Sequence, residues 1–117
     1  MKRTTADLAH RLVLRRLPPY RVIVLPWLRR LGHRFVLPDW LAITIGPLII
    51  AWRPLDEAEL AHELAHVRQW REHGLRFIPR YLGASADAAR AGGERHRDNA
   101  FEVEARAVEA AARRAGP

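Results

Sequence analysis

The most regular hydrophobic pattern of the chain lies between Asp56 and Gly74. One apolar stripe runs along this segment at helical spacing and is formed by Leu60, Leu64 and Val67. Such spacing predicts an amphipathic helix. Asp56 followed by Glu59 is a capping-box pattern that begins a helix, and Gly74 is placed to end it.

A different pattern precedes that helix. Residues 35–52 are rich in Ile, Val, Leu and Trp, and Gly46-Pro47 separates two short apolar runs. Short runs of this composition around a turn dipeptide predict two strands, Leu41–Ile45 and Leu48–Trp52, joined by a tight turn. We therefore expect a β-hairpin or a small sheet before the helix.

The two ends of the chain read as helical. Residues 1–34 mix leucines and valines with many arginines, and prolines divide them into short helical pieces. A short helix is expected around Pro79 over residues 75–83, and a polar loop over 84–98. From Asn99 to about Arg114 the sequence is rich in alanine and predicts a final helix, with one face formed by Phe101, Ala105, Val108 and Ala112.

This order of elements predicts an α+β fold. The expected organisation is a basic amphipathic helical segment over residues 1–34, followed by a domain over 35–117. The length of 117 residues fits one ordinary domain, and the 49% apolar composition is that of a globular protein.

Composition also limits the chemistry. There is no cysteine, so a metal would have to be bound by His, Asp or Glu. The formal net charge of +7 attracts polyanions, either nucleic acid or an anionic membrane surface. Nucleic acid is the weaker expectation because no reading motif or aromatic stacking platform accompanies the arginines.

Two features of the sequence argue against a targeting or membrane-spanning segment. The apolar run Val22–Leu28 is short, and no small-residue cleavage site follows it, which argues against a signal peptide. The most apolar window, Trp40–Trp52, is shorter than the roughly 20 residues that span a bilayer. We expect a cytoplasmic protein, with a basic helix resting on a membrane surface as an alternative.

One motif carries chemistry. Residues 62–66 read His-Glu-Leu-Ala-His, an HExxH motif on the segment predicted to be helical. The spacing of four places both imidazoles on one helix face, which suits two ligands of a single Zn²⁺. Glu63 would lie beside the metal, where its carboxylate can take a proton from water and deliver it to a leaving amine.

A hydrolytic site of this kind needs a third protein ligand. His73 lies on the same face as His66 but about 10 Å further along the helix axis, too far to share one zinc. An antiparallel helix could supply a carboxylate, and the final helix offers Glu102 and Glu104. The other downstream candidates are Asp87, Glu94, His96, Asp98 and Glu109.

The segments HELAHVRQW and NAFEVEA together resemble the small single-domain gluzincins, or minigluzincins, and related uncharacterised bacterial families. The resemblance covers about residues 41–110 and implies a small zincin-like domain, in which the first Glu of an E-x-x-A-D pattern is the third metal ligand. That position is Glu102 here. The chain departs from the pattern at Arg106, where larger families often carry an Asp that supports a ligand histidine. The resemblance also implies that Ala42–Ile45 is a sheet edge that pairs with an extended substrate.

Several alternatives remain at this stage. Glu102 could instead close a capping box with Asn99, leaving Glu104 or neither carboxylate as the ligand. The arginine-rich N-terminal segment could cover the sheet edge and make the enzyme latent. Gln69 continues the face of the two histidines, and three residues are candidates to stabilise an oxyanion: Tyr81, His73 and His96.

The predicted function is zinc-dependent hydrolysis of peptide bonds. The expected metal ligands are His62, His66 and Glu102, the catalytic residue is Glu63, and the partner is a peptide or protein substrate. Two rivals stand beside it, a zinc-binding module without turnover and a basic membrane-surface protein in which HExxH is incidental. No sequence feature indicates an oligomeric state.

Overall fold

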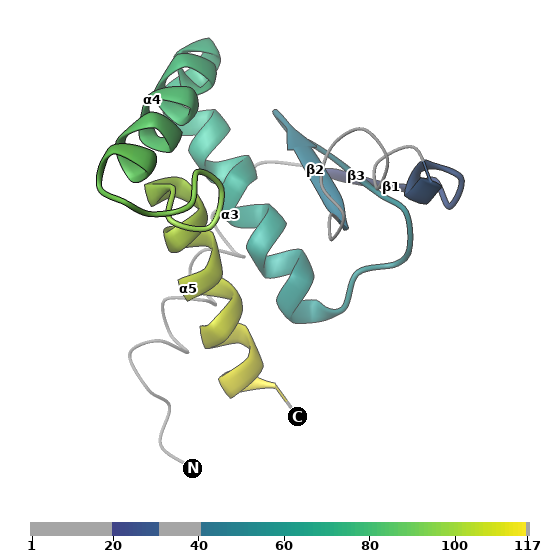
Figure 1. Cartoon of the computed structure of the whole chain (residues 1–117). Coiled ribbons are helices and arrows are strands. Elements are labelled where there is room, and N and C mark those ends of the chain that lie inside the picture. Colours follow the sequence, from purple (N-terminus) through teal and green to yellow (C-terminus); the bar gives the residue numbers. More distant parts are fainter. Residues whose placement is uncertain (1–19, 31–40, 117) are drawn as a thin grey trace.

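The computed structural model describes residues 20–30 and 41–116. These residues form an α+β fold, as predicted (Figure 1). The strands are β1 (Arg21–Val24), β2 (Ala42–Ile45) and β3 (Leu48–Ala51), and the helices are α3 (Glu57–His73), α4 (Phe77–Arg90) and α5 (Ala100–Ala115), with a 3₁₀ turn η1 (Gly74–Arg76) between α3 and α4.

The predicted hairpin is present. Strands β2 and β3 are antiparallel, with Ile45 opposite Leu48 across the Gly46-Pro47 turn. Gly46 has a φ of 58°. A positive φ at the first turn position is shared by the two tight turns that match the twist of a hairpin, and glycine adopts it without strain.

The sheet contains a third strand that the sequence reading missed. Residues 21–24 were predicted to be part of a helical segment, but they form β1, which pairs in parallel with β3. The run Val22-Ile23-Val24 is β-branched, and branched side chains pack well on a pleated sheet beside β3. Residues 28–30 are helical. The rest of the predicted N-terminal helices falls on residues 1–19 and 31–34, outside the described residues.

Helix α3 begins and ends where predicted. Asp56 Oδ1 accepts from the backbone N–H of Glu59, and the Glu59 carboxylate accepts from the N–H of Asp56, at 2.7 and 3.0 Å. Such a cap stabilises a helix by about 1 kcal/mol. Gly74, with a φ of 60°, ends the helix. The predicted apolar stripe packs beneath the sheet in a cluster formed by Ile49, Leu64 and Val67, with Ala42, Leu55 and Leu60 around it.

Helix α4 is longer than predicted. It continues to Arg90 through residues expected to be a loop, because the alanines of that stretch favour helix. The loop before α5 is correspondingly shorter. Helix α5 begins after Asn99, as expected from the sequence.

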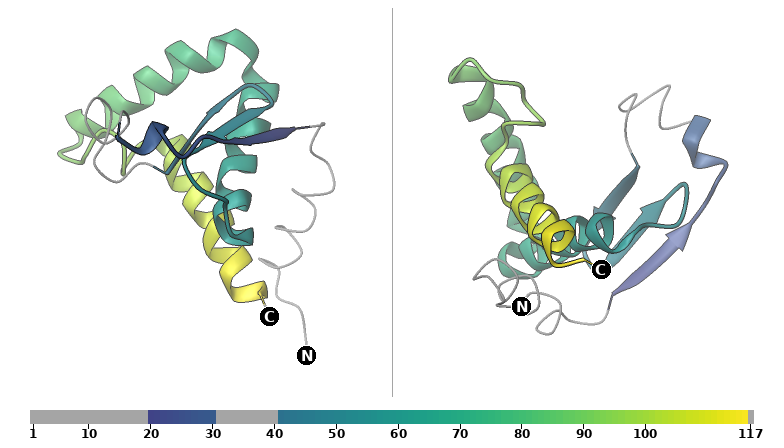
Figure 2. Two further views of the ribbon diagram at one scale, coloured as in Figure 1. Left: turned by 90° about the vertical axis from the view of Figure 1, so that its right-hand side faces the viewer. Right: turned by 90° about the horizontal axis from the view of Figure 1, so that it is seen from below.

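Helices α3 and α5 pack side by side (Figure 1). They run antiparallel, because Asp56, before α3, contacts Arg113 near the end of α5, whereas His66, further along α3, contacts Glu102 near the start of α5. Alanines line the contact: Ala58, Ala61 and Ala112 form a buried cluster with Val108. Small side chains let two helix axes approach closely. In the right-hand view of Figure 2, the sheet and α5 lie on different sides of α3. Among residues 20–30 and 41–116, no helix combines the length and apolar composition needed to cross a membrane.

Candidate metal centre

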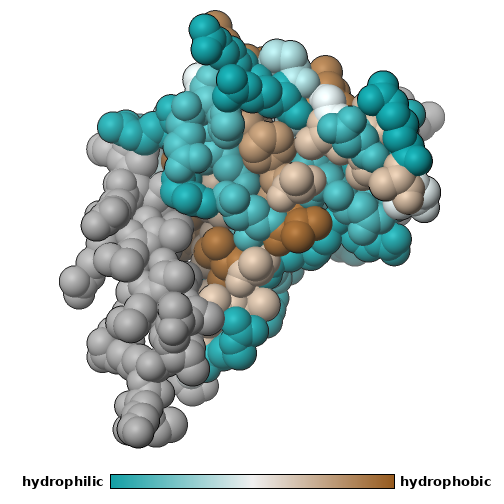
Figure 3. Space-filling view, turned by 90° about the vertical axis from the view of Figure 1, so that its left-hand side faces the viewer, coloured by the Kyte–Doolittle hydropathy of each residue, from teal (hydrophilic) through white to brown (hydrophobic). Residues whose placement is uncertain are grey.

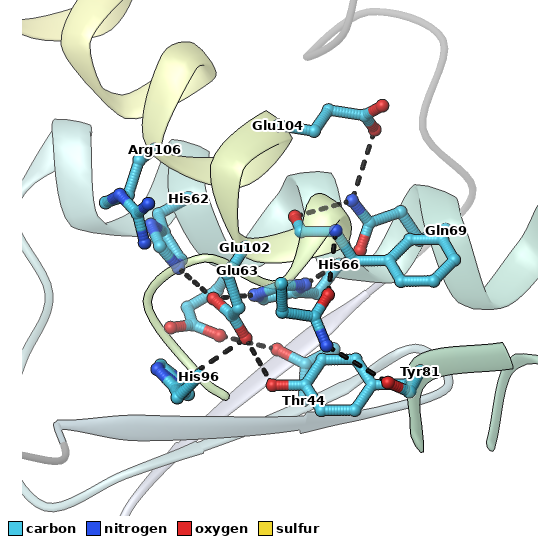
Figure 4. Close-up of polar contacts among 12 residues, drawn as sticks. Thr44, His62, Glu63, His66, Gln69, Tyr81, His96, Glu102, Glu104 and Arg106 are labelled. Atoms are coloured by element: carbon cyan, nitrogen blue, oxygen red, sulfur yellow. Dashed lines mark hydrogen bonds and ion pairs between the residues drawn. The ribbon is translucent and has the colours of Figure 1, made fainter. Parts of the chain in front are cut away.

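The two histidines of the HExxH motif converge with Glu102 between α3 and α5 (Figure 4). One ligand atom from each of the three residues lies within 4.8 Å of the others. Glu102 Oε2 lies 3.4 Å from His62 Nε2 and 3.2 Å from His66 Nε2. Ligand atoms about 2.0–2.1 Å from a tetrahedral zinc are about 3.4 Å apart, so these two distances fit a shared metal ion.

The other ring nitrogen of each histidine is already bonded. His62 Nδ1 lies 2.8 Å from Glu109 Oε1, and His66 Nδ1 lies 2.8 Å from Gln69 Oε1. Both partner oxygens accept, so each Nδ1 carries the proton and each Nε2 is left with its lone pair when the ring is neutral. Metal-binding histidines are commonly oriented in this way by a second partner.

Gln69 occupies a place that fixes its amide orientation. Its side chain is 1% exposed. Nε2 donates to the backbone oxygen of Phe101 at 3.0 Å and to Glu104 Oε1 at 3.1 Å, which leaves Oε1 to accept from His66. Gln69 therefore joins the face of α3 that carries the two histidines to the first turn of α5.

Glu109 is the residue that sequence reasoning ranked too low. It was considered only as a candidate metal ligand, whereas its carboxylate contacts the far nitrogen of His62. The family resemblance placed the supporting carboxylate at position 106, which is Arg here. Glu109 is seven residues after Glu102 and so shares its helix face, which is the signal that could have found it.

The second oxygen of Glu102 is held from α4 and from the following loop. Tyr81 donates its hydroxyl to Oε1 at 2.8 Å, and His96 Nε2 lies 3.4 Å from the same oxygen. Tyr81 was an oxyanion candidate, but the structure places its hydroxyl on Glu102. Buried Asn99 holds the two helices together, since its Nδ2 donates to the backbone oxygen of Tyr81 at 3.0 Å.

The cap of α5 shows whether Glu102 forms a capping box with Asn99 or faces the histidines. Its side chain accepts from the N–H of Phe101 and so caps α5. The Glu102 side chain points instead to the histidines and is 5% exposed, so it forms no capping box.

The electrostatics of the centre reflect this burial. Desolvation alone would raise the pKa of Glu102, but hydrogen bonds with His62 and His66 outweigh it and hold the pKa far below its ordinary value. Desolvation would likewise lower the pKa values of both histidines, yet the carboxylate of Glu102 raises them. Desolvation and the neighbouring Glu102 raise the pKa of Tyr81, so its hydroxyl keeps its proton.

Glu63 lies beside the centre and faces the sheet. Thr44 on β2 donates its hydroxyl to Glu63 Oε2 at 2.8 Å (Figure 4). Two turns further along α3, Trp70 donates its indole N–H to the backbone oxygen of Thr44 at 3.0 Å. These bonds fix β2, which is an edge of the described sheet, against the helix that carries the histidines.

The remaining candidates lie elsewhere. Glu104 is half-exposed and bonds Arg68, and His73 packs against Phe101 at the end of α3. Asp87 pairs with Arg90 at 3.3 Å. Glu94 and Asp98 bond backbone N–H groups within the loop before α5.

No protein-family model matches the chain, and comparisons with curated proteins and with solved structures found no match either.

Proposed function

We propose that the chain is a zinc-dependent metallopeptidase. The observation that carries the proposal is the centre itself: two Nε2 atoms and one carboxylate oxygen converge while both Nδ1 atoms are bonded elsewhere. The donor set of two imidazoles and a carboxylate is that of the His₂Glu zinc peptidases. His62, His66 and Glu102 would hold the ion.

When bound there, zinc would supply the Lewis acidity that activates water and polarises a carbonyl. Glu63 would act as the general base and then as the general acid, taking a proton and returning it to the leaving amine. The hydrogen bond from Thr44 fixes one oxygen of that carboxylate. Tyr81 and His96 orient Glu102 through its other oxygen.

We further propose that an extended peptide binds along β2. This strand is an edge of the described sheet and carries Thr44, which contacts Glu63. A peptide can add to such an edge through its backbone. Because Trp70 already donates to Thr44 O, an incoming strand would compete with that bond.

The first experiment measures zinc content by mass spectrometry for the purified protein and for His62→Ala, Glu102→Gln and Glu104→Gln variants. About one zinc per chain is expected, with loss in the first two variants and retention in the third. A wild-type chain that takes up no zinc after reconstitution would overturn the proposal.

The second experiment separates an enzyme from a zinc module without turnover. The rival is favoured by the position of the centre between α3 and α5, because an ion there would also tie the two helices together. Glu63→Gln should keep zinc and lower hydrolysis of a mixed peptide library by about 10²–10⁴-fold. Glu72→Gln, an exposed position on the same helix, serves as the control. Wild-type protein that binds zinc but cleaves no peptide would overturn the enzyme proposal and support a zinc-binding module without turnover.

A further inference from the structure

The face of the sheet that points away from α3 is apolar. In each strand alternate side chains point to opposite faces, and Ile49 and Ala51 of β3 are the ones buried toward α3. The opposite face is therefore formed by the residues that alternate with them along β3 and by the residues paired with those on β1 and β2. The registers place them in two rows across the sheet, Ile23–Ile50–Ile43 and Arg21–Leu48–Ile45.

Three isoleucines of this outer face are widely exposed. Ile23, Ile43 and Ile45 are 41, 46 and 52% exposed. A sheet face that meets water normally carries polar side chains. An outer face on which every residue except Arg21 is aliphatic is instead typical of a surface that is covered in the working protein.

The surroundings of the outer face are basic and aromatic. Residues 20–30 and 41–52 contain three arginines and no acidic residue, whereas the next arginine, Arg53, is paired with Glu59. Trp27, after β1, is 65% exposed, and Tyr20, before it, is 39% exposed. Arg21 belongs to the outer face itself, and Arg29 and Arg30 follow Trp27.

A second exposed apolar stripe serves as a comparison. Leu75, Ile78 and Leu82 on η1 and α4 are 83, 50 and 63% exposed. That stripe lies among charges of both signs, since Glu72 and Asp87 accompany its arginines. The molecular face in Figure 3 is likewise mostly hydrophilic, with small separate hydrophobic patches. The outer sheet face differs because the strands, with the turn between β2 and β3 and the segment directly after β1, carry arginines and no carboxylate.

We propose that the outer face of the sheet docks on an anionic lipid surface. Isoleucines and Trp27 would enter the boundary between headgroups and acyl chains, and the arginines would attract the lipid phosphates. Charge favours this occupant, because anionic headgroups complement the three arginines of residues 20–30 and 41–52, segments that contain no carboxylate. This inference does not depend on the proposed peptidase activity.

Docking would also place the candidate centre close to the membrane. Strand β2 contributes Ile43 and Ile45 to the outer face and Thr44, from the opposite face, to Glu63. Glu63, beside the centre, would therefore lie about one sheet thickness from the lipid, within reach of peptide segments near a membrane.

The test is flotation of the full-length protein with phosphatidylcholine vesicles, with and without phosphatidylglycerol, at low and high salt. Wild-type protein should bind only the anionic vesicles and should be released by salt. The sheet variant Ile23→Thr/Ile43→Thr/Ile45→Thr keeps β-branched residues in the strands. Its affinity for the anionic vesicles should be at least about tenfold lower than that of the wild type. The control variant is Leu75→Gln/Ile78→Gln/Leu82→Gln, which should bind like the wild type.

Both variants keep residues 1–19, so any contribution of that segment is equal in the two. If the sheet variant fails to fold by circular dichroism, Trp27→Ser, outside the strands, takes its place with an expected loss of several-fold. Equal binding by the sheet and control variants would overturn the proposal. A sheet variant that loses self-association by light scattering while keeping vesicle binding would show a dimer interface and would also overturn it.

Discussion

The helical half of the molecule and its sheet bury residues in opposite ways. Between α3 and α5 the interior contains polar groups, and Gln69, Asn99 and Glu102 are at most 5% exposed. Each has hydrogen-bond partners in the neighbouring helix or loop. In the sheet, by contrast, Ile49 packs against Leu64 and Val67 of α3, while the isoleucines of the opposite face are largely exposed.

This difference shows which half is built for specificity. Buried polar groups are costly unless every partner is in place, so the helical interface admits few alternative arrangements. Aliphatic packing on a sheet has no such directional requirement. The first half can hold a precise centre, and the second can offer an adaptable contact surface.

The largest expected effect is a difference in the free energy of unfolding between substitutions on the two faces of the sheet. Ile49→Ala removes side-chain volume from the cluster beneath the sheet and should lower the free energy of unfolding by about 2–5 kcal/mol. Ile43→Ala, on the outer face, should cost less than about 1 kcal/mol. Urea unfolding of the two variants measures both. Equal losses would mean that the outer face is as well packed as the inner one.

The next effect concerns the helical centre. Glu109→Gln weakens the acceptor of the His62 Nδ1–H and should lower zinc affinity by about 10–100-fold. Glu104→Gln should change the zinc affinity little, because the new amide oxygen can still accept from Gln69 and Gln69 also keeps its bond to the backbone oxygen of Phe101. Competition with a chelating dye gives both affinities. A fall for Glu104→Gln as large as for Glu109→Gln would contradict the assigned role of Glu109.

The smallest effect is a pH window in the metal-free protein. Glu102 has a lowered pKa, so its contribution to stability is full above the ordinary value of 4.5 and is lost as pH falls through the lowered pKa. His62 and His66 have raised pKa values, so their contribution is full below the ordinary value of 6.5 and is lost as pH rises through the raised values. The network should therefore stabilise the metal-free chain most between about pH 4.5 and 6.5.

Thermal unfolding with a chelator present, across that pH range, measures this window. Glu102→Gln removes the charge on which both shifts depend and should flatten the profile. An unchanged profile in that variant would assign the pH dependence to other groups.

Local patterns in the sequence were enough for several elements. The bounds of α3 follow from the capping box and Gly74, and the hairpin follows from a turn dipeptide between two apolar runs. These signals are local, so short-range chemistry determines them. Strand β1 was missed because its four residues gain their structure from pairing with β3, more than 20 residues away in sequence.

The candidate centre divides in the same way. The spacing of His62 and His66 already places them on one helix face, whatever lies around that helix. The choice between Glu102 and Glu104 as their neighbour depended on how α5 is rotated against α3. Alanines at the contact and the bonds of Asn99 and Gln69 fix that rotation, and no local rule gives it.

The sequence by itself determined the metal-binding type of motif, the absence of cysteine ligands, the helix that carries the histidines and the positive charge. Only the tertiary structure decided that Glu102 faces both histidines, that Glu109 and Gln69 orient them, and that one face of the sheet is left apolar and exposed. The physical reason is that helix spacing and capping act within a few residues, whereas the rotation of two packed helices and the covering of a sheet face depend on contacts between distant parts of the chain.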